Sequence, residues 1–93
     1  MSPDAVPALP SGVRLHRCAV REAWFLLAPE RALKLDAIGH AILSRVDGEQ
    51  SLAAIVADLA ASFGAPPEQV ETDVVRFLGD LSDRMVLVIR APA

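Results

Sequence analysis

Three side chains in this 93-residue sequence are of types that hold metals or act as nucleophiles, namely His16, Cys18 and His40. A structural zinc site takes four ligands, and its cysteines and histidines usually occur as closely spaced pairs. Here only His16 and Cys18 are neighbours, and a single cysteine leaves no second thiolate. We therefore interpret His16 as a half-exposed strand residue, Cys18 as a small buried thiol and His40 as a helix-surface imidazole, and we expect no metal site.

Catalysis by Cys18 would need a neighbouring base and an electropositive setting, because the thiolate is the reactive form. His16 is two residues away on the same strand face, but no other residue type completes such a site. The sequence also lacks a Gly-rich phosphate loop, and no pair of carboxylates stands out among its 12 acidic residues. We expect neither a catalytic residue nor a cofactor.

The composition is that of one small domain with an aliphatic core. Hydrophobic residues make up 53% of the chain, and aromatic residues only 4%. The formal net charge of −3 disfavours a sequence-independent hold on nucleic acid or an anionic membrane. No apolar run reaches the ~18 residues of a spanning helix, and no secretory pattern is visible at the N-terminus. With the lone cysteine, these features favour a cytoplasmic protein.

Short β-leaning segments predict a three-stranded antiparallel meander, because their connections are too short for parallel crossovers. The segments and their turns cover residues 13–20, 21–23, 24–27, 28–31 and 32–35. Before them, residues 1–12 hold three prolines and predict a flexible arm, so the folded domain is expected at 13–93.

Apolar residues at helical spacing predict three helices after the meander. Their expected ends are marked by Asp36 and Gly48 for the first, Ser51 and Gly64 for the second, and Pro66-Pro67 at the start of the third. Gly39 and Gly79 lie inside helices, where each costs up to ~1 kcal/mol, and we expect close approach of a neighbouring element there.

The apolar run 85–89 follows the third helix and predicts a last strand. Strands and helices are therefore segregated along the chain, which predicts an α+β fold. We expect a small winged-helix-like domain, in which a three-stranded antiparallel meander is followed by a three-helix bundle and a C-terminal strand.

The helical part resembles a helix-turn-helix, which makes DNA binding an alternative function. The third helix would then be the recognition helix, but it carries five acidic residues and two basic ones: Glu68, Glu71, Asp73, Asp80 and Asp83, against Arg76 and Arg84. Because phosphates would repel such a helix, we disfavour a nucleic-acid-binding winged helix. A purely structural dimerisation module is a further alternative.

The edge strands of a meander expose N–H and C=O groups that can pair with another strand. A five-residue edge offers about 4–6 hydrogen bonds of ~0.5–1.5 kcal/mol each. That sum, less association costs, falls short of the ~8 kcal/mol of micromolar binding. Binding a peptide there would need an apolar floor, which Val70, Val74 and Phe77 of the third helix can supply.

Three stretches occur in a specific order: LLAPERALKLD at 26–36, ILSRVDGEQSLAAIVADL at 42–59 and VVRFLGDLSDR at 74–84. In this order they resemble the PqqD family of pyrroloquinoline quinone (PQQ) biosynthesis, and the resemblance covers residues 13–86. It implies a peptide chaperone without enzymatic activity. Members bind a ribosomal precursor peptide and present it to a radical SAM enzyme that cross-links a glutamate and a tyrosine of the peptide.

The resemblance also implies where a peptide would bind. In related recognition elements the peptide adds as a strand beside the third strand and lies against the third helix, which correspond to residues 31–35 and 67–83. We expect Arg31, Lys34 and Arg76 to face acidic residues of the peptide. The predicted peptide-binding residues are Arg31, Ala32, Leu33, Lys34, Leu35, Val70, Asp73, Val74, Arg76, Phe77 and Leu81.

One position departs from the family. Members usually have glycine after the basic residue that closes the last helix, and this chain has Met85 there. Glycine takes a positive φ at little cost, whereas methionine does not. We therefore expect the chain to leave this helix differently, as a strand paired within the domain or with another chain. Strand exchange between two copies would give a homodimer.

Overall fold

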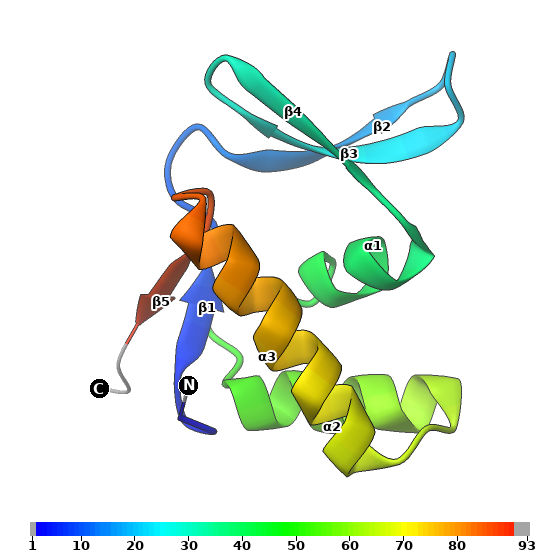
Figure 1. Ribbon diagram of the computed structural model, residues 1–93, viewed down its shortest axis with the longest axis vertical. Coiled ribbons are helices and arrows are strands. Elements are labelled where there is room, and N and C mark those ends of the chain that lie inside the picture. The colour runs from blue at the N-terminus through cyan, green and yellow to red at the C-terminus, as the bar shows by residue number, and fades with distance from the viewer. Residues whose placement is uncertain (1, 91–93) are drawn as a thin grey trace.

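The computed structural model describes residues 2–90, and its sheet lies as a separate layer over the helices (Figure 1). The elements in chain order are β1 (Val6–Ala8), β2 (Arg14–Cys18), β3 (Ala23–Ala28), β4 (Arg31–Leu35), α1 (Ala37–Leu43), α2 (Leu52–Phe63), α3 (Pro67–Asp83) and β5 (Val88–Arg90). Strands β2, β3 and β4 form an antiparallel meander, and β1 pairs with β5. The predicted α+β class, with its meander, three helices and C-terminal strand, is confirmed. No helix within residues 2–90 has the length and hydropathy to cross a membrane.

The β3–β4 hairpin is closed by a two-residue turn at Pro29-Glu30, since Ala28 pairs with Arg31. Proline suits the first turn position because its ring sets φ, and Glu30 follows with a φ of +63°, as in a type II turn. This tight turn brings β4 back beside β3 as a sheet edge.

The caps predicted for the second helix are confirmed, and so is the start of the first. The Asp36 carboxylate accepts a hydrogen bond from the Gly39 N–H at 2.6 Å, and Gly64 ends α2 with a φ of +61°. Helix α1 ends at Leu43, short of the predicted Gly48. After Leu43 the backbone tightens, because the Arg45 and Val46 N–H groups donate to carbonyls three residues back. The Arg45 side chain donates to the Ala41 carbonyl at 2.7 Å and pairs with Asp58 of α2.

The hydrophobic core fills the space between the meander and the three helices. Its most deeply buried large side chains come from β3, all three helices and the C-terminal run: Leu26, Ile42, Leu43, Leu52, Ile55, Val74, Leu78 and Val86. On β4 the alternation is clear, because Leu35 is buried whereas Lys34 is exposed. The meander is therefore covered by helices on one face.

The expectation for Met85 was wrong. Met85 has a φ of +63° and ends α3 as glycine would. Its N–H donates to the Ser82 carbonyl, and the Val86 N–H donates to the Leu81 carbonyl at 3.1 Å, which is the Schellman pattern. Because Val86 and Leu81 are both buried in the core, their packing holds Met85 in this conformation while its side chain stays 83% exposed.

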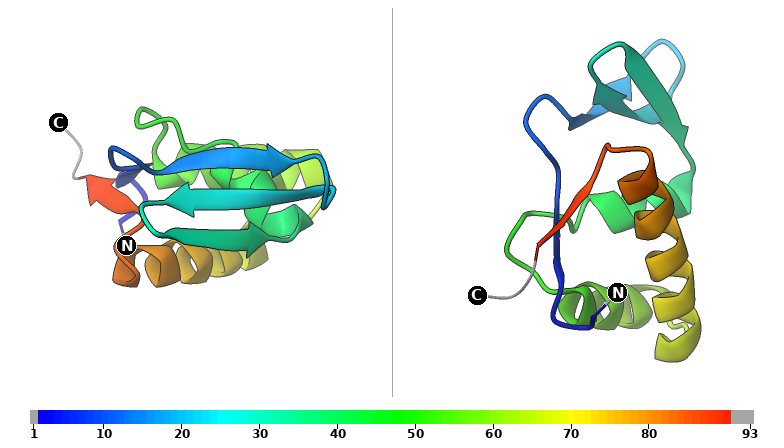
Figure 2. Two further views of the ribbon diagram at one scale, coloured as in Figure 1. Left: turned by 90° about the horizontal axis from the view of Figure 1, so that it is seen from above. Right: turned by 60° about the vertical axis from the view of Figure 1, so that its left-hand side comes forward.

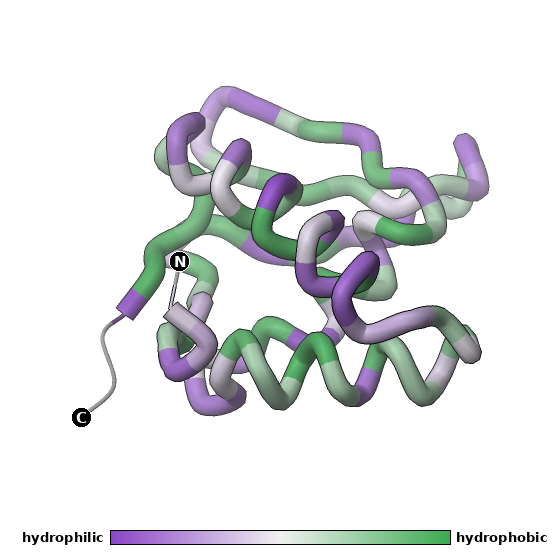
Figure 3. The backbone as a smooth tube through the Cα atoms, turned by 60° about the horizontal axis from the view of Figure 1, so that its bottom comes forward, coloured by the Kyte–Doolittle hydropathy of each residue, from purple (hydrophilic) through white to green (hydrophobic). Residues whose placement is uncertain are grey.

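The run after Met85 pairs within the domain, which was one of the two predicted outcomes. Figure 3 shows it as a hydrophobic segment that ends at the hydrophilic Arg90. Its strand β5 is antiparallel to β1, with Pro7 opposite Ile89.

The N-terminal segment differs from the predicted flexible arm. Ala5, Pro7 and Ala8 are buried. The carbonyls of Pro3 and Ala5 accept hydrogen bonds from the Ala53 and Leu52 N–H groups at 2.9 and 2.7 Å. These donors belong to the first turn of α2, which has no partners for them within the helix. Composition indicated flexibility here because it carries no information on such distant partners.

Candidate functional site

The open edge of β4 lies beside α3 (Figure 2, left). Among residues 2–90, β4 pairs only with β3, so its other side offers free backbone groups. At the start of the strand, Arg31 Nη2 donates to the Arg84 carbonyl at the C-terminus of α3, at 2.9 Å. This hydrogen bond ties the hairpin to the helix, and it gives Arg31 a structural role besides the predicted contact with a peptide.

An open groove runs between α1 and α3 below the end of β4. Its main part has a volume of about 730 Å³, and a hollow of about 310 Å³ adjoins it where Lys34, Leu35 and Asp36 meet Phe77. Phe77 lines both parts. We call this space the β4–α3 groove and define it by Lys34, Asp36, Ile38, Asp73, Phe77 and Asp80.

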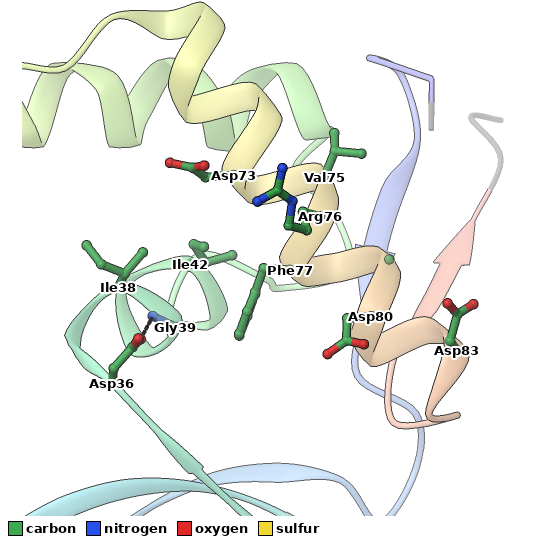
Figure 4. Close-up of a pocket in the computed structure, with 11 residues that line it drawn as sticks. Asp36, Ile38, Gly39, Ile42, Asp73, Val75, Arg76, Phe77, Asp80 and Asp83 are labelled. Atoms are coloured by element: carbon green, nitrogen blue, oxygen red, sulfur yellow. Dashed lines mark hydrogen bonds between the residues drawn. The ribbon is translucent and has the colours of Figure 1, made fainter.

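The Phe77 ring packs against Gly39 of α1 (Figure 4). A Cβ atom on Gly39 would lie 3.1 Å from Phe77 Cζ and 3.2 Å from Asp36 Oδ1. The prediction of close approach at this glycine is confirmed. At Gly79 it was wrong, because a Cβ there would meet nothing within 4 Å. Gly79 instead lines the groove.

The structure separates the predicted peptide-binding residues into three groups. Leu35, Val74 and Leu81 are buried in the core, with exposed fractions of 8%, 1% and 4%. Leu33, Val70 and Phe77 are half-buried, and the remaining side chains are exposed: Arg31, Ala32, Lys34, Asp73 and Arg76. Of all these, Lys34, Leu35, Asp73, Arg76 and Phe77 come together around the main groove and its adjoining hollow. Phe77 lines the main groove, whereas Val70 and Val74 line a smaller pocket that shares Ile38 and Ile42 with it.

Sequence reasoning missed the contribution of α1. Ile38 and Ile42 line the groove, and Ile38 is 54% exposed. Their helical spacing predicts a core stripe, and Ile42 is indeed buried, with an exposed fraction of 2%, whereas Ile38 is not. Periodicity does not distinguish buried members of such a stripe from uncovered ones. The available signal was position, because Ile38 stands in the first turn directly after the edge strand.

Of the three residues of chemical interest, His40 has a clear packing role. His40 stacks on Trp24 with ring centroids 4.1 Å apart and an interplanar angle of 17°, so it is half-buried rather than a surface imidazole. His16 is exposed on β2, and Cys18 is half-buried at the end of that strand. Within residues 2–90, no group of three or more histidine, cysteine, aspartate or glutamate residues is placed to hold a metal.

The exposed surface of α3 is acidic. All five of its carboxylates are exposed, against the exposed Arg76 and the capping Arg84. Arg84 forms an ion pair with Asp80 at 3.4 Å, which leaves it still less available to a phosphate. This surface disfavours a groove-reading role on DNA.

Solved structures share this fold. The solution NMR structure of the PqqD truncation of Methylobacterium extorquens PqqCD has a TM-score of 0.77 and 38% identity, over 95% of this chain and 99% of that one. It is described as a functional, stand-alone recognition element for ribosomally synthesized and post-translationally modified peptides. The crystal structure of PqqD from Xanthomonas campestris has a TM-score of 0.59 and 44% identity, over 92% and 96%.

The meander, the helices and the open edge beside a groove define a small α+β domain of the type seen in these PqqD structures. The family model described as coenzyme PQQ synthesis protein D (PqqD) matches residues 23–87. A PqqA binding protein of Xanthomonas campestris pv. campestris strain 8004 is 45% identical over 87 residues, covering 94% of this chain and 95% of the relative. Another, from Rhizobium meliloti strain 1021, is 46% identical over 89 residues, covering 96% and 91%. The chain belongs to the PqqD family.

Proposed function

We propose that this chain is a non-catalytic peptide chaperone of PQQ biosynthesis, which binds the precursor peptide PqqA by strand addition at β4. The observation that carries the proposal is the open β4 edge beside an apolar groove, in a chain whose relatives are named PqqA binding proteins. Strand addition would use the backbone of β4, and the groove would receive the peptide side chains that face the helices.

The groove offers the apolar floor that backbone pairing needs. Ile38 and Phe77 present partly exposed apolar surface next to the edge. Covering apolar surface contributes about 25 cal/mol per Å², so about 100–150 Å² on this floor would add roughly 2.5–4 kcal/mol. Added to the edge hydrogen bonds, this amount brings micromolar affinity within reach.

The proposal also covers the cellular compartment and the partner enzyme. We place the complex in the cytoplasm, where the free Cys18 would stay reduced. The bound peptide would then be presented to a radical SAM enzyme that carries out the chemistry, so the chaperone itself needs no catalytic group and no cofactor.

The test is a titration of isotope-labelled protein with PqqA, followed by amide chemical shifts. Shifts are expected along β4 and α3. Ile38→Asp and Phe77→Asp should each weaken binding about tenfold or more, because a carboxylate would enter the apolar floor. The matched control is Val20→Asp at the β2–β3 turn, a side chain that is 93% exposed. If Phe77→Asp disturbs folding, Ile38→Asp still tests the apolar floor.

The result that would refute the proposal is a set of amide shifts confined to residues outside β4 and α3. Unchanged affinity in a folded Ile38→Asp variant would count against the groove as the floor of the site.

A second copy of the chain is the competing occupant of the edges. Within residues 2–90, β2 and β4 both end the three-stranded sheet, so either edge could pair with its counterpart in a dimer. Light scattering over a range of concentrations separates the two cases. A dimer that dissociates when PqqA is added would show that the peptide and the second copy compete for one edge.

A further inference from the structure

The two faces of the meander meet different surroundings. Its strands carry basic residues on both faces, and Arg31 on the helix-facing side is held by its hydrogen bond to the Arg84 carbonyl. Strands β2, β3 and β4 contain no acidic residue, and the two glutamates of this region, Glu22 and Glu30, lie in the turns. On the outer face, Lys34 stands opposite Phe25, and His16 stands on the other side of the same phenylalanine. The Arg21 guanidinium lies over the Phe25 ring, 5.9 Å from its centroid. The outer face beside the open edge is therefore cationic.

The opposite face of β4 looks toward an acidic groove. Asp36, Asp73, Asp80 and Asp83 line it, with Asp80 paired to Arg84. Arg76 is the only basic side chain of the main groove within the described residues. Figure 4 shows Asp73 and Asp80 reaching from α3 toward the side of α1, with Phe77 between the two helices. A side chain entering this space meets apolar surface flanked by carboxylates.

Successive side chains of a strand point to opposite faces, so they meet these two environments in turn. Leu35 faces the helices, and Lys34 lies on the outward face of the strand, at the rim of the hollow beside Phe77. A strand added to β4 continues the pleat, so its successive side chains enter the groove and the outer face in turn. A peptide residue added beside Lys34 has a cation as its cross-strand neighbour. The peptide residues before and after it point toward the α3 carboxylates.

We propose that the edge of β4 selects an extended peptide segment with alternating chemistry. Apolar and basic side chains face the groove, and acidic side chains face outward beside Lys34. The inference rests on the proposed function and adds the class of peptide that the site accepts. It also reverses the expected role of the helix side of the site, where an acidic peptide residue would meet four carboxylates and one arginine of the main groove. Peptide register follows from it, since a shift of one residue would exchange the two sets of charges.

Two synthetic peptides of identical composition test the selection. Both carry leucines at two successive inward positions. The first has lysines at the flanking inward positions and glutamates at two outward positions, and the second has these charges exchanged. A favourable cross-strand charge pair contributes about 0.2–1 kcal/mol, or up to roughly fivefold in affinity. With several pairs reversed at once, the first peptide should bind about fivefold or more tightly at low salt, and the difference should shrink at high salt.

Charge-reversal variants localise the effect. Lys34→Glu and Asp80→Lys should each reduce the preference for the first peptide. The matched control is Glu71→Lys, which makes the same change of charge on α3 but lies in a separate hollow against α2, and which should leave the preference intact. Amide shifts of β4 report in every case whether the peptide adds at this edge.

Equal affinity for the two peptides, with β4 shifts present for both, would overturn the charge selection and leave strand addition standing. The charge selection would also be overturned if neither synthetic peptide shifted the β4 amides while PqqA did. Absence of β4 shifts with PqqA as well would overturn the proposed function and the inference together.

Discussion

Met85 adopts a backbone conformation that glycine takes at little cost, and it does so because its neighbours are buried. The αL region costs a residue with a Cβ atom about 1–2 kcal/mol. Val86 and Leu81 on either side of the Schellman turn are in the core, and moving them to relieve Met85 would expose both. The strain is thus kept in place by packing.

Met85→Gly should therefore stabilise the fold. Relief of the αL strain is partly offset by the larger backbone entropy of glycine in the unfolded chain, which leaves a gain of about 0.5–1 kcal/mol. The measurement is the urea midpoint at unchanged m-value. Gly64→Ala is the mirrored control and should destabilise, because Gly64 has a φ of +61°. A lower midpoint for Met85→Gly would contradict the assignment of strain.

The two helical glycines should respond in opposite ways to alanine. Gly79→Ala adds a methyl group in open space and should stabilise α3 by up to about 1 kcal/mol. Gly39→Ala pushes its Cβ toward Phe77 and Asp36, and this overpacking should cost about 1–3 kcal/mol. Denaturant unfolding measures both. Equal changes in the free energy of unfolding for the two variants would show that the Phe77 ring moves away freely.

At the scale of elements, the groove depends on how β4, α1 and α3 are held together. The Asp36 cap starts α1 directly at the end of β4, and the Arg31–Arg84 hydrogen bond fixes the other end of the strand to α3. Phe77 on Gly39 sets the spacing of the two helices. Three local contacts thus shape one site.

Arg31→Ala should loosen the edge without unfolding the domain. Loss of this exposed hydrogen bond should cost about 0.5–1.5 kcal/mol and increase hydrogen exchange of the β4 amides. Arg14→Ala, an exposed arginine of β2, is the control. Unchanged exchange in β4 would show that the hairpin keeps its place by packing alone.

At this scale the sequence predicted element types well. Asp36, Ser51, Gly64 and the proline pair before α3 mark helix ends by local hydrogen bonding or steric restriction, so they can be recognised without tertiary information. The exposure of the groove residues was predicted less well. Val74 and Leu81 belong to the same helical stripe as the half-buried Phe77, and only the position of α1 decides which of them is covered.

The whole molecule depends on contacts between its two ends. Strand β1 pairs with β5, and the carbonyls of Pro3 and Ala5 complete the first turn of α2. Figure 1 shows β1 and β5 side by side, away from the meander. The N-terminal segment is thus part of the fold.

Deletion of residues 2–8 should destabilise the domain by at least about 2 kcal/mol, because two α2 donors lose their acceptors and β5 loses its partner strand. Thermal unfolding would then shift down by roughly 8 °C or more for a domain of this size. Asp4→Ala, an exposed side chain in the same segment, should have little effect. An unchanged melting temperature after the deletion would show that the β1–β5 pair adds no stability.

The sequence by itself determined the meander, the three helices, their order, most of the helix caps and the family, because these depend on local chemistry and on the order of motifs along the chain. Tertiary structure decided three matters that involve distant residues. It placed β1 on β5, held Met85 at a positive φ, and put Ile38 with Phe77 and the α3 carboxylates around one groove. Each depends on which surfaces meet when the core closes, and periodicity within one segment does not contain that information.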